Sequence, residues 1–431
     1  MRFGIAETDI TPRDGMTAMS GYGRRRYARG VVSPLMLGAA VIEDDAGRRH
    51  ALIAADLLGF DRTTTLLLRH RLAGAGFAPE RVMLNASHTH YGPPTQFGFS
   101  AAVGPVDPWY IAWMEERALD TVQAACAALA EVELRCGSFP ARIGHNRRLR
   151  RLTPAPGEAD GYDEHAAFLW ARPKDSRGQE AVLLAHGCHP VFSGAEGYCA
   201  DWPGEFRRQG TLRRPGTRFA FLQGCGGDIN GPDKEHYVAE GGRLAEDLIS
   251  QLREETTRIV SGAFACAIQE SRLTFGRRFG ASWVERNFLE SASPLMALYA
   301  REHRHHPDTR RCLPYSVQVW RADEFSIIGM EGEVANAYAA VARGMAGGEC
   351  MVLGYSNAVE CYVPTEQILR EGGYEAEDSC WAYRLPGFLS VSTPAVIRRT
   401  LQRAVDAVSP AGVQGARGCA MKTKGKGARP R

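Results

Sequence analysis

The stretch Arg81-Val82-Met83-Leu84-Asn85-Ala86-Ser87-His88-Thr89-His90-Tyr91-Gly92-Pro93-Pro94 is the one around which the rest of the chain is organised. Its apolar start predicts a buried strand, and the closing glycine and prolines put both histidines on a strand-to-loop transition. Residues two apart in an extended segment point to the same side, so His88 and His90 are expected to face one cavity. Imidazole serves both as a metal ligand and as a proton shuttle, so this pair can supply both functions. An HxH pattern also occurs in polar surface turns, and other motifs must decide between the two.

The elements before this stretch predict the fold class. Alternating residues predict strands over residues 3–6 and 35–43, and an apolar run predicts a buried strand over 50–60. A helix over residues 61–74 then precedes the HxH strand. This strand-helix-strand order predicts an α/β protein. Asp56, at the end of its strand, is expected either to orient a site residue or to cap the next element.

Helices and strands continue along the chain without an internal repeat. Asp107 at the cap position and Pro108 at the first helical position predict a helix over residues 107–130. Further helices are expected over residues 235–254, 335–345 and 394–408, and further strands over 132–137, 181–185, 219–223, 264–275 and 325–334.

Three later motifs resemble the HxH element because polar residues follow an apolar strand. After residues 181–185, either His186 or His189 is a candidate ligand, with Cys188 as a softer one. Residues 224–227 form a glycine-rich loop whose amides are expected to converge on an oxyanion. The strand over 325–334 ends at two acids, Glu331 and Glu333, and a carboxylate there is placed to be a third ligand of a metal held by two histidines.

Arginine and histidine clusters elsewhere have plainer interpretations. Arg147 or Arg148, in a turn-like setting, is a candidate for holding a substrate carbonyl or carboxylate. Residues 24–26 are three adjacent arginines, and a solvated loop is favoured over an anion site. Residues 302–306 carry three histidines among charged residues and are expected on the surface.

Composition limits the functional class. The 431 residues contain 44% hydrophobic and 23% charged residues and no linker, so we expect one catalytic body over residues 1–410. Residues 411–431 are expected to form a basic, disordered tail. A net charge of +3 does not imply nucleic acid or an anionic membrane as a partner, and no apolar run predicts membrane insertion. No signal pattern is visible, and 11 cysteines without paired spacing favour reduced thiols, so a cytoplasmic protein is expected.

Taken together, the motifs resemble the neutral/alkaline non-lysosomal ceramidase family. The matching set is His-Thr-His-x-Gly-Pro, Cys-His-Pro, a Gly-Gly-Asp loop, Gly-Glu-Val, and Tyr-Val-Pro-Thr with a tyrosine twelve residues later. The resemblance runs from residue 6 to about 375 and implies mixed β-sheets flanked by helices. Members are zinc amidases, which implies zinc ligands at His88, His189, Glu333 and Tyr362. It also implies proton transfer or oxyanion contact by His90, and binding of the scissile carbonyl region by Arg147 and Tyr374.

The chain departs from this family at several points. No C-terminal immunoglobulin-like domain is visible, and Gln223-Gly224-Cys225 stands where the family has a serine. We therefore expect a small N-acyl compound as substrate in preference to ceramide. The predicted function is a zinc-dependent amidohydrolase, with one Zn2+ per chain, that cleaves a linear non-peptide amide. One alternative is a zinc enzyme acting on an ester or lactone or by a non-hydrolytic step. The other is a non-catalytic, metal-stabilised binding protein.

Overall fold

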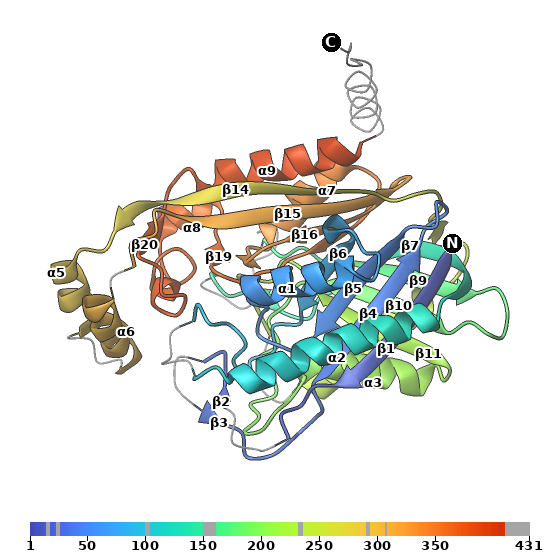
Figure 1. Cartoon of the computed structure of the whole chain (residues 1–431), viewed down its shortest axis with the longest axis horizontal. Coiled ribbons are helices and arrows are strands. Elements are labelled where there is room, and N and C mark those ends of the chain that lie inside the picture. Colours follow the sequence, from blue (N-terminus) through green and yellow to red (C-terminus); the bar gives the residue numbers. More distant parts are fainter. Residues whose placement is uncertain are drawn as a thin grey trace, which may run out of the picture.

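The computed structural model of the chain is shown in Figure 1. It describes residues 1–13, 18–22, 26–99, 104–149, 161–231, 236–289, 294–306 and 308–409. The expected basic tail over 411–431 lies outside these residues, as do its boundary at residue 410 and two of the three adjacent arginines.

Within the described residues, the larger sheet has nine strands of mixed direction. Its order is β11 (Thr217–Gln223), β10 (Glu180–His186), β9 (His165–Pro173), β7 (Ala130–Pro140), β1 (Arg2–Asp9), β4 (Met36–Glu43), β5 (Arg49–Ala55) and β6 (Val82–Ala86), with β13 (Arg258–Ile259) beside β7. β5 and β6 are parallel and are connected through α1 (Arg62–Ala73). β10 and β11 are also parallel and are connected through α3 (Asp201–Arg213). The other strand pairs in this sheet are antiparallel. The predicted strand-helix-strand unit and the mixed sheet are confirmed.

A second sheet packs on the first. Its order is β18 (Glu349–Leu353), β16 (Phe325–Met330), β15 (Cys312–Ala322), β14 (Ala265–Arg278) and β20 (Gly387–Leu389). Short pairs form between β2 (Ala18–Met19) and β3 (Arg26–Tyr27), β8 (His145–Asn146) and β12 (Ile229–Asn230), and β17 (Glu333–Val334) and β19 (Tyr362–Val363). The last of these pairs sets Glu333 directly opposite Tyr362.

Helices cover the outer faces of both sheets, as Figure 1 shows. α1 and α2 (Pro108–Ala127) pack on the half of the larger sheet that holds β1, β4, β5 and β6. α3 and α4 (Tyr237–Gln251) pack on the half that holds β9, β10 and β11. α7 (Ala337–Ala346) and α9 (Thr393–Val408) cover the second sheet. The other α-helices in the part of the chain that the structure describes are α5 (Ala281–Val284), α6 (Pro294–His305) and α8 (Glu366–Glu371).

The two sheets share an apolar core, so each buries the apolar face of the other. Leu52 and Met83 of the larger sheet pack with Trp320, Ile327 and Met351 of the second. Each of these side chains is at most 2% exposed, and burial of a large apolar side chain stabilises a fold by about 1.5–3 kcal/mol. The loops that leave the two sheets therefore meet at fixed positions.

Local signals determine where the helices begin. The Asp61 side chain accepts a hydrogen bond from the Thr63 amide and caps α1, and Asp107 does the same for Trp109 at the start of α2. Both helices agree with the prediction. The sequence analysis missed β9, β15 and α3. The strand predicted over residues 325–334 is interrupted, because Gly332 adopts a φ of 84° between β16 and β17.

A side chain joins the two edges of the larger sheet. The Asn85 amide on β6 donates to the Gln223 carbonyl of β11 at 3.1 Å, and the Gln223 amide donates back to Asn85 Oδ1 at 2.7 Å. Asn85 also donates to the Gly354 carbonyl at 2.8 Å. This pairing acts as one rung of a strand ladder and draws the ends of β6 and β11 together.

Candidate metal and catalytic site

Two histidines at strand ends present the same ring nitrogen to one point. His88 follows β6, and its Nδ1 lies 2.6 Å from the Leu58 carbonyl. His189 follows β10, and its Nδ1 lies 2.7 Å from the Gly226 carbonyl. A carbonyl only accepts hydrogen bonds, so both Nδ1 atoms carry the proton. Both Nε2 atoms are therefore free to act as ligands.

A buried carboxylate faces these nitrogens. Glu333 Oε2 lies 3.1 Å from Nε2 of His88 and 3.1 Å from Nε2 of His189. The other carboxylate oxygen accepts a hydrogen bond from the Tyr383 hydroxyl. Glu333 lies in β17, directly after β16 of the second sheet, and the two histidines follow strands of the larger sheet, so the site lies where elements from both sheets meet. The neighbouring Glu331 is instead bonded to Arg62.

His90 completes a group of three imidazoles. Its Nε2 lies 3.2 Å from Nε2 of His88, and one ligand atom from each of His88, His90 and His189 lies within 4.8 Å of the other two. His90 Nδ1 is buried without a partner among the described residues. The Tyr22 ring lies edge-on at 5.1 Å and the Arg26 guanidinium donates to the His90 carbonyl, so the loop is held in place.

Burial determines the charge of the site. It lowers the pKa of His189 to about 4, although the nearby Glu333 carboxylate opposes the shift. Burial alone would raise the pKa of Glu333, but its close contacts with the imidazoles of His88 and His189 outweigh this and hold that pKa well below its usual range. Near pH 7 the site therefore combines the neutral imidazole of His189 with an anionic carboxylate.

Tyr362 and Tyr374 lie beside this centre, with Arg147 between them. The Arg147 guanidinium donates to the Tyr362 hydroxyl at 3.2 Å and to Glu375 at 2.7 Å. It lies 5.3 Å from the Tyr374 ring centroid. Tyr362 is buried, whereas Tyr374 is 43% exposed and packs edge-on against it at 5.5 Å. Arg147 is thus held by protein partners, and part of Tyr374 reaches the surface.

The glycine-rich loop differs from its expected role. The Gly224 amide donates to the His186 carbonyl at 2.9 Å, and the Gly227 amide donates to the Val334 carbonyl at 2.8 Å. These two amides are occupied and do not form an oxyanion site. The loop acts through its carbonyls instead, since Gly226 fixes the tautomer of His189.

Two further expectations need correction, and one open alternative is resolved. His88 has a φ of 66°, so it is not extended, and the two histidines converge through a left-handed turn. His186 pairs with the Tyr162 hydroxyl at 2.8 Å, which leaves His189 as the site residue. Asp56 neither orients a site residue nor caps a helix, because it pairs with Arg207.

Two tyrosines near the centre were missed by the sequence analysis. Tyr383 bonds to Glu333, and the Tyr355 ring stacks on His88 with centroids 4.3 Å apart. Neither residue follows a predicted strand or belongs to a motif with ligand spacing. The sequence carries no local signal for them.

The donor set suits a metal ion. Nε2 of His88, Nε2 of His189 and Oε2 of Glu333 are all acceptors, and they face one another at short range. Acceptors this close repel unless a cation or a shared proton lies between them. Two imidazoles and a carboxylate are a usual ligand set for zinc.

Comparison with solved structures identifies the fold. The chain superimposes on neutral ceramidase from Pseudomonas aeruginosa with a TM-score of 0.73, covering 94% of this chain and 74% of that one at 20% sequence identity. The chain has the ceramidase fold. A structure of ceramidase complexed with C2 gives a TM-score of 0.71, covering 94% of this chain and 75% of that one, also at 20% identity. The fold expected from the resemblance is thereby confirmed. No protein-family model and no curated protein matches the sequence.

Two further observations concern the helices and the cysteines. Among the described residues, no helix combines the length and apolar character needed to cross a membrane. The cysteines in the described part of the chain are free thiols.

Proposed function

We propose that the chain is a zinc-dependent amidohydrolase that cleaves a linear, non-peptide N-acyl compound. The observation that carries this proposal is the convergence of His88 Nε2 and His189 Nε2 on Glu333 Oε2, at 3.1 Å each. The shared ceramidase fold supports hydrolysis of an amide bond. The free cysteines support a reducing, cytoplasmic location.

Four residues would hold one zinc ion: His88, His189, Glu333 and Tyr362. Glu333 and Tyr362 are paired across β17 and β19, so both side chains leave one short ladder. Zinc held by such ligands supplies Lewis-acid chemistry and activates water toward an amide carbonyl. The Tyr383 hydroxyl fixes the orientation of the Glu333 carboxylate.

His90, Tyr374 and Arg147 are assigned to the substrate. His90 is the imidazole beside His88 and is proposed to transfer a proton to the departing amine. Tyr374 is exposed enough to donate to the substrate carbonyl. Arg147 is proposed to act at the same carbonyl region and keeps Tyr362 and Tyr374 in place through its contacts with both.

One observation favours a second candidate function. The three imidazoles lie within 4.8 Å of one another, so His90 could be a ligand instead of a proton donor. If His90 were added to His88, His189, Glu333 and Tyr362 as a ligand, no position would be left for water, which is typical of a structural metal. The chain would then be a metal-stabilised binding protein.

Metal content separates these candidates. We expect about one zinc per chain in the wild-type protein, a loss of zinc in His189→Ala, and retention in His186→Ala. His186 is the matched control because it is equally buried at the end of the same strand but is bonded to Tyr162. His90→Ala should keep its zinc and lose the release of amine from N-acyl substrates.

Other outcomes would decide against the proposal. Loss of zinc in His90→Ala, together with no amine release by the wild type, would favour the binding protein. No zinc in the wild type, even after zinc is added, would remove the ligand assignment.

A further inference from the structure

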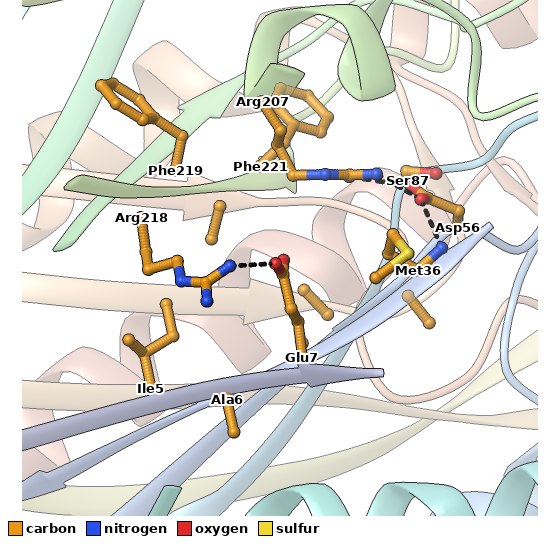
Figure 2. Close-up of a pocket in the computed structure, with 14 residues that line it drawn as sticks. Ile5, Ala6, Glu7, Met36, Asp56, Ser87, Arg207, Arg218, Phe219 and Phe221 are labelled. Carbon is orange, nitrogen blue, oxygen red and sulfur yellow. Dashed lines mark hydrogen bonds and ion pairs between the residues drawn. The ribbon is translucent and has the colours of Figure 1, made fainter. Parts of the chain in front are cut away.

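A cavity of about 270 Å³ lies between β11 and the side of β1, β4 and β5 that carries Ile5, Glu7 and Gly38, as Figure 2 shows. We call it the β11-edge cavity. It is lined by residues that include Ile5, Glu7, Gly38, Ser87, Phe219 and Phe221. The lining does not include His88, His90, His189 or Glu333, so it is separate from the candidate metal site.

Phe219 and Phe221 line this cavity with their backbone. Their rings point to the other side of β11, where the Phe219 ring lies 6.0 Å from the ring of Phe206 and the Phe221 ring lies 4.6 Å from that of Trp202. Figure 2 shows both rings on the side of β11 away from Glu7. The part of each residue that reaches the cavity is therefore its peptide group.

Strand geometry gives the direction of these peptide groups. β11 is an edge strand of the described sheet and pairs only with β10 there. Both polar backbone groups of Gln223 face Asn85, on the open side. Alternate residues of a strand share this direction, so the N–H and C=O groups of Phe219 and Phe221 also face the open side. Buried peptide groups require hydrogen-bond partners.

A buried hydroxyl also lines the cavity. Ser87 is 3% exposed, and its Oγ has no hydrogen-bond partner among the described residues. The cavity thus combines donors and acceptors from two walls.

The charged groups around the cavity are already paired. Arg218 donates to Glu7 at 2.6 Å, and Arg207 donates to Asp56 at 3.0 Å. Figure 2 shows the first pair bridging β11 and β1. Two cations and two carboxylates leave no net charge, so a neutral ligand fits better than an anion.

We infer that the β11-edge cavity is a binding site for a small, neutral molecule that carries amide groups. Its amide N–H and C=O would pair with the open edge of β11, as those of an added strand do. Ser87 Oγ offers one more hydrogen bond, and Ile5 and Met36 supply apolar contact. This site is independent of the proposed hydrolysis, because it shares no lining side chain with the metal centre.

Gly38 provides a clean way to block the cavity. A Cβ atom built on Gly38 meets only the Ala6 carbonyl oxygen, at 3.8 Å, so a side chain there enters open space. Gly38→Val is expected to fill the cavity and keep the strand, since valine favours extended backbone. Gly38→Ala is the milder variant. Gly344→Ala is the matched control, because Gly344 is exposed in α7 and has no neighbour within 4 Å of an added Cβ.

The test is ligand-observed NMR with N-acetylglycinamide, a neutral molecule with two amides. We expect binding to the wild type and to Gly344→Ala, and a dissociation constant raised at least tenfold in Gly38→Val. Gly38→Ala should weaken binding less. If Gly38→Val shows no cooperative thermal unfolding, Gly38→Ala decides in its place.

Short amides also resemble the proposed substrate class, so His189→Ala is titrated in parallel. Unchanged binding in His189→Ala supports the cavity as the site, whether or not the chain hydrolyses amides. Loss of binding in His189→Ala, equal binding in Gly38→Val, or no binding to the wild type would each overturn the inference.

Discussion

Replacing Tyr383 by phenylalanine should weaken zinc binding without unfolding the protein. The Tyr383 hydroxyl donates to Glu333, whose carboxylate is buried and anionic. A hydrogen bond to a charged group contributes about 1.5–3 kcal/mol. At about 1.36 kcal/mol per tenfold change, the full loss would lower zinc affinity by roughly ten- to 150-fold. Loss of such outer partners of metal ligands typically costs about 10–100-fold in affinity.

The assay is a competition titration against a chromophoric zinc chelator at fixed pH, with Tyr338→Phe as the control. Tyr338 is also buried, but its hydroxyl donates to the neutral Pro364 carbonyl at 3.1 Å and not to a proposed zinc ligand. Tyr338→Phe should lose about 1 kcal/mol of stability and no zinc affinity. Wild-type zinc affinity in Tyr383→Phe, or equal losses in both variants, would refute the reasoning.

Two further predictions concern stability. Burial lowers the pKa of His50 from 6.5 to about 4, although its hydrogen bond to Asp44 opposes the shift. As the pH falls from 6.5 toward 4, His50 therefore becomes protonated in the unfolded chain but stays neutral in the folded one. By pH 5 this difference in protonation lowers the free energy of unfolding by about 2 kcal/mol. Urea unfolding should show a smaller drop in the free energy of unfolding between pH 7 and pH 5 for His50→Gln than for the wild type. An equal drop in both proteins would contradict this. Asn85→Leu should destabilise the protein by about 3 kcal/mol, because the buried N–H and C=O groups of Gln223 both lose their partner, whereas the Gly354 carbonyl keeps the Ser356 hydroxyl. Urea unfolding measures this loss, and wild-type stability would show that the two sheet edges do not depend on Asn85.

Local signals in the sequence were enough for much of the fold. Caps such as Asp61 and Asp107 determine where helices begin, and apolar runs determine buried strands, because these depend on neighbouring residues only. The order of strands in the sheets depends on contacts between distant segments, and the sequence analysis did not give it. It also missed β15, a central strand of the second sheet.

For the candidate site too, local sequence predicted some features, and others depend on contacts between distant segments. His88 and His90 were predicted to face one cavity from local spacing, and their nitrogens do meet, although through a left-handed turn at His88. Glu333 lies 144 residues from His189. Its place at a strand end made it one of two candidate acids with Glu331, and only the resemblance to known enzymes selected it. The oxyanion role was wrong for the amides of Gly224 and Gly227, because their partners come from other strand ends and no local pattern reveals them.

The position of Glu333 has a consequence for how the protein matures during synthesis. The first sheet can form before Glu333 leaves the ribosome, and until then the two histidines have no carboxylate opposite them. Contacts over such sequence distances form slowly, since a long loop must close first. A nascent chain should therefore acquire its metal late, after the second sheet has docked, and metal uptake would report completion of the whole fold.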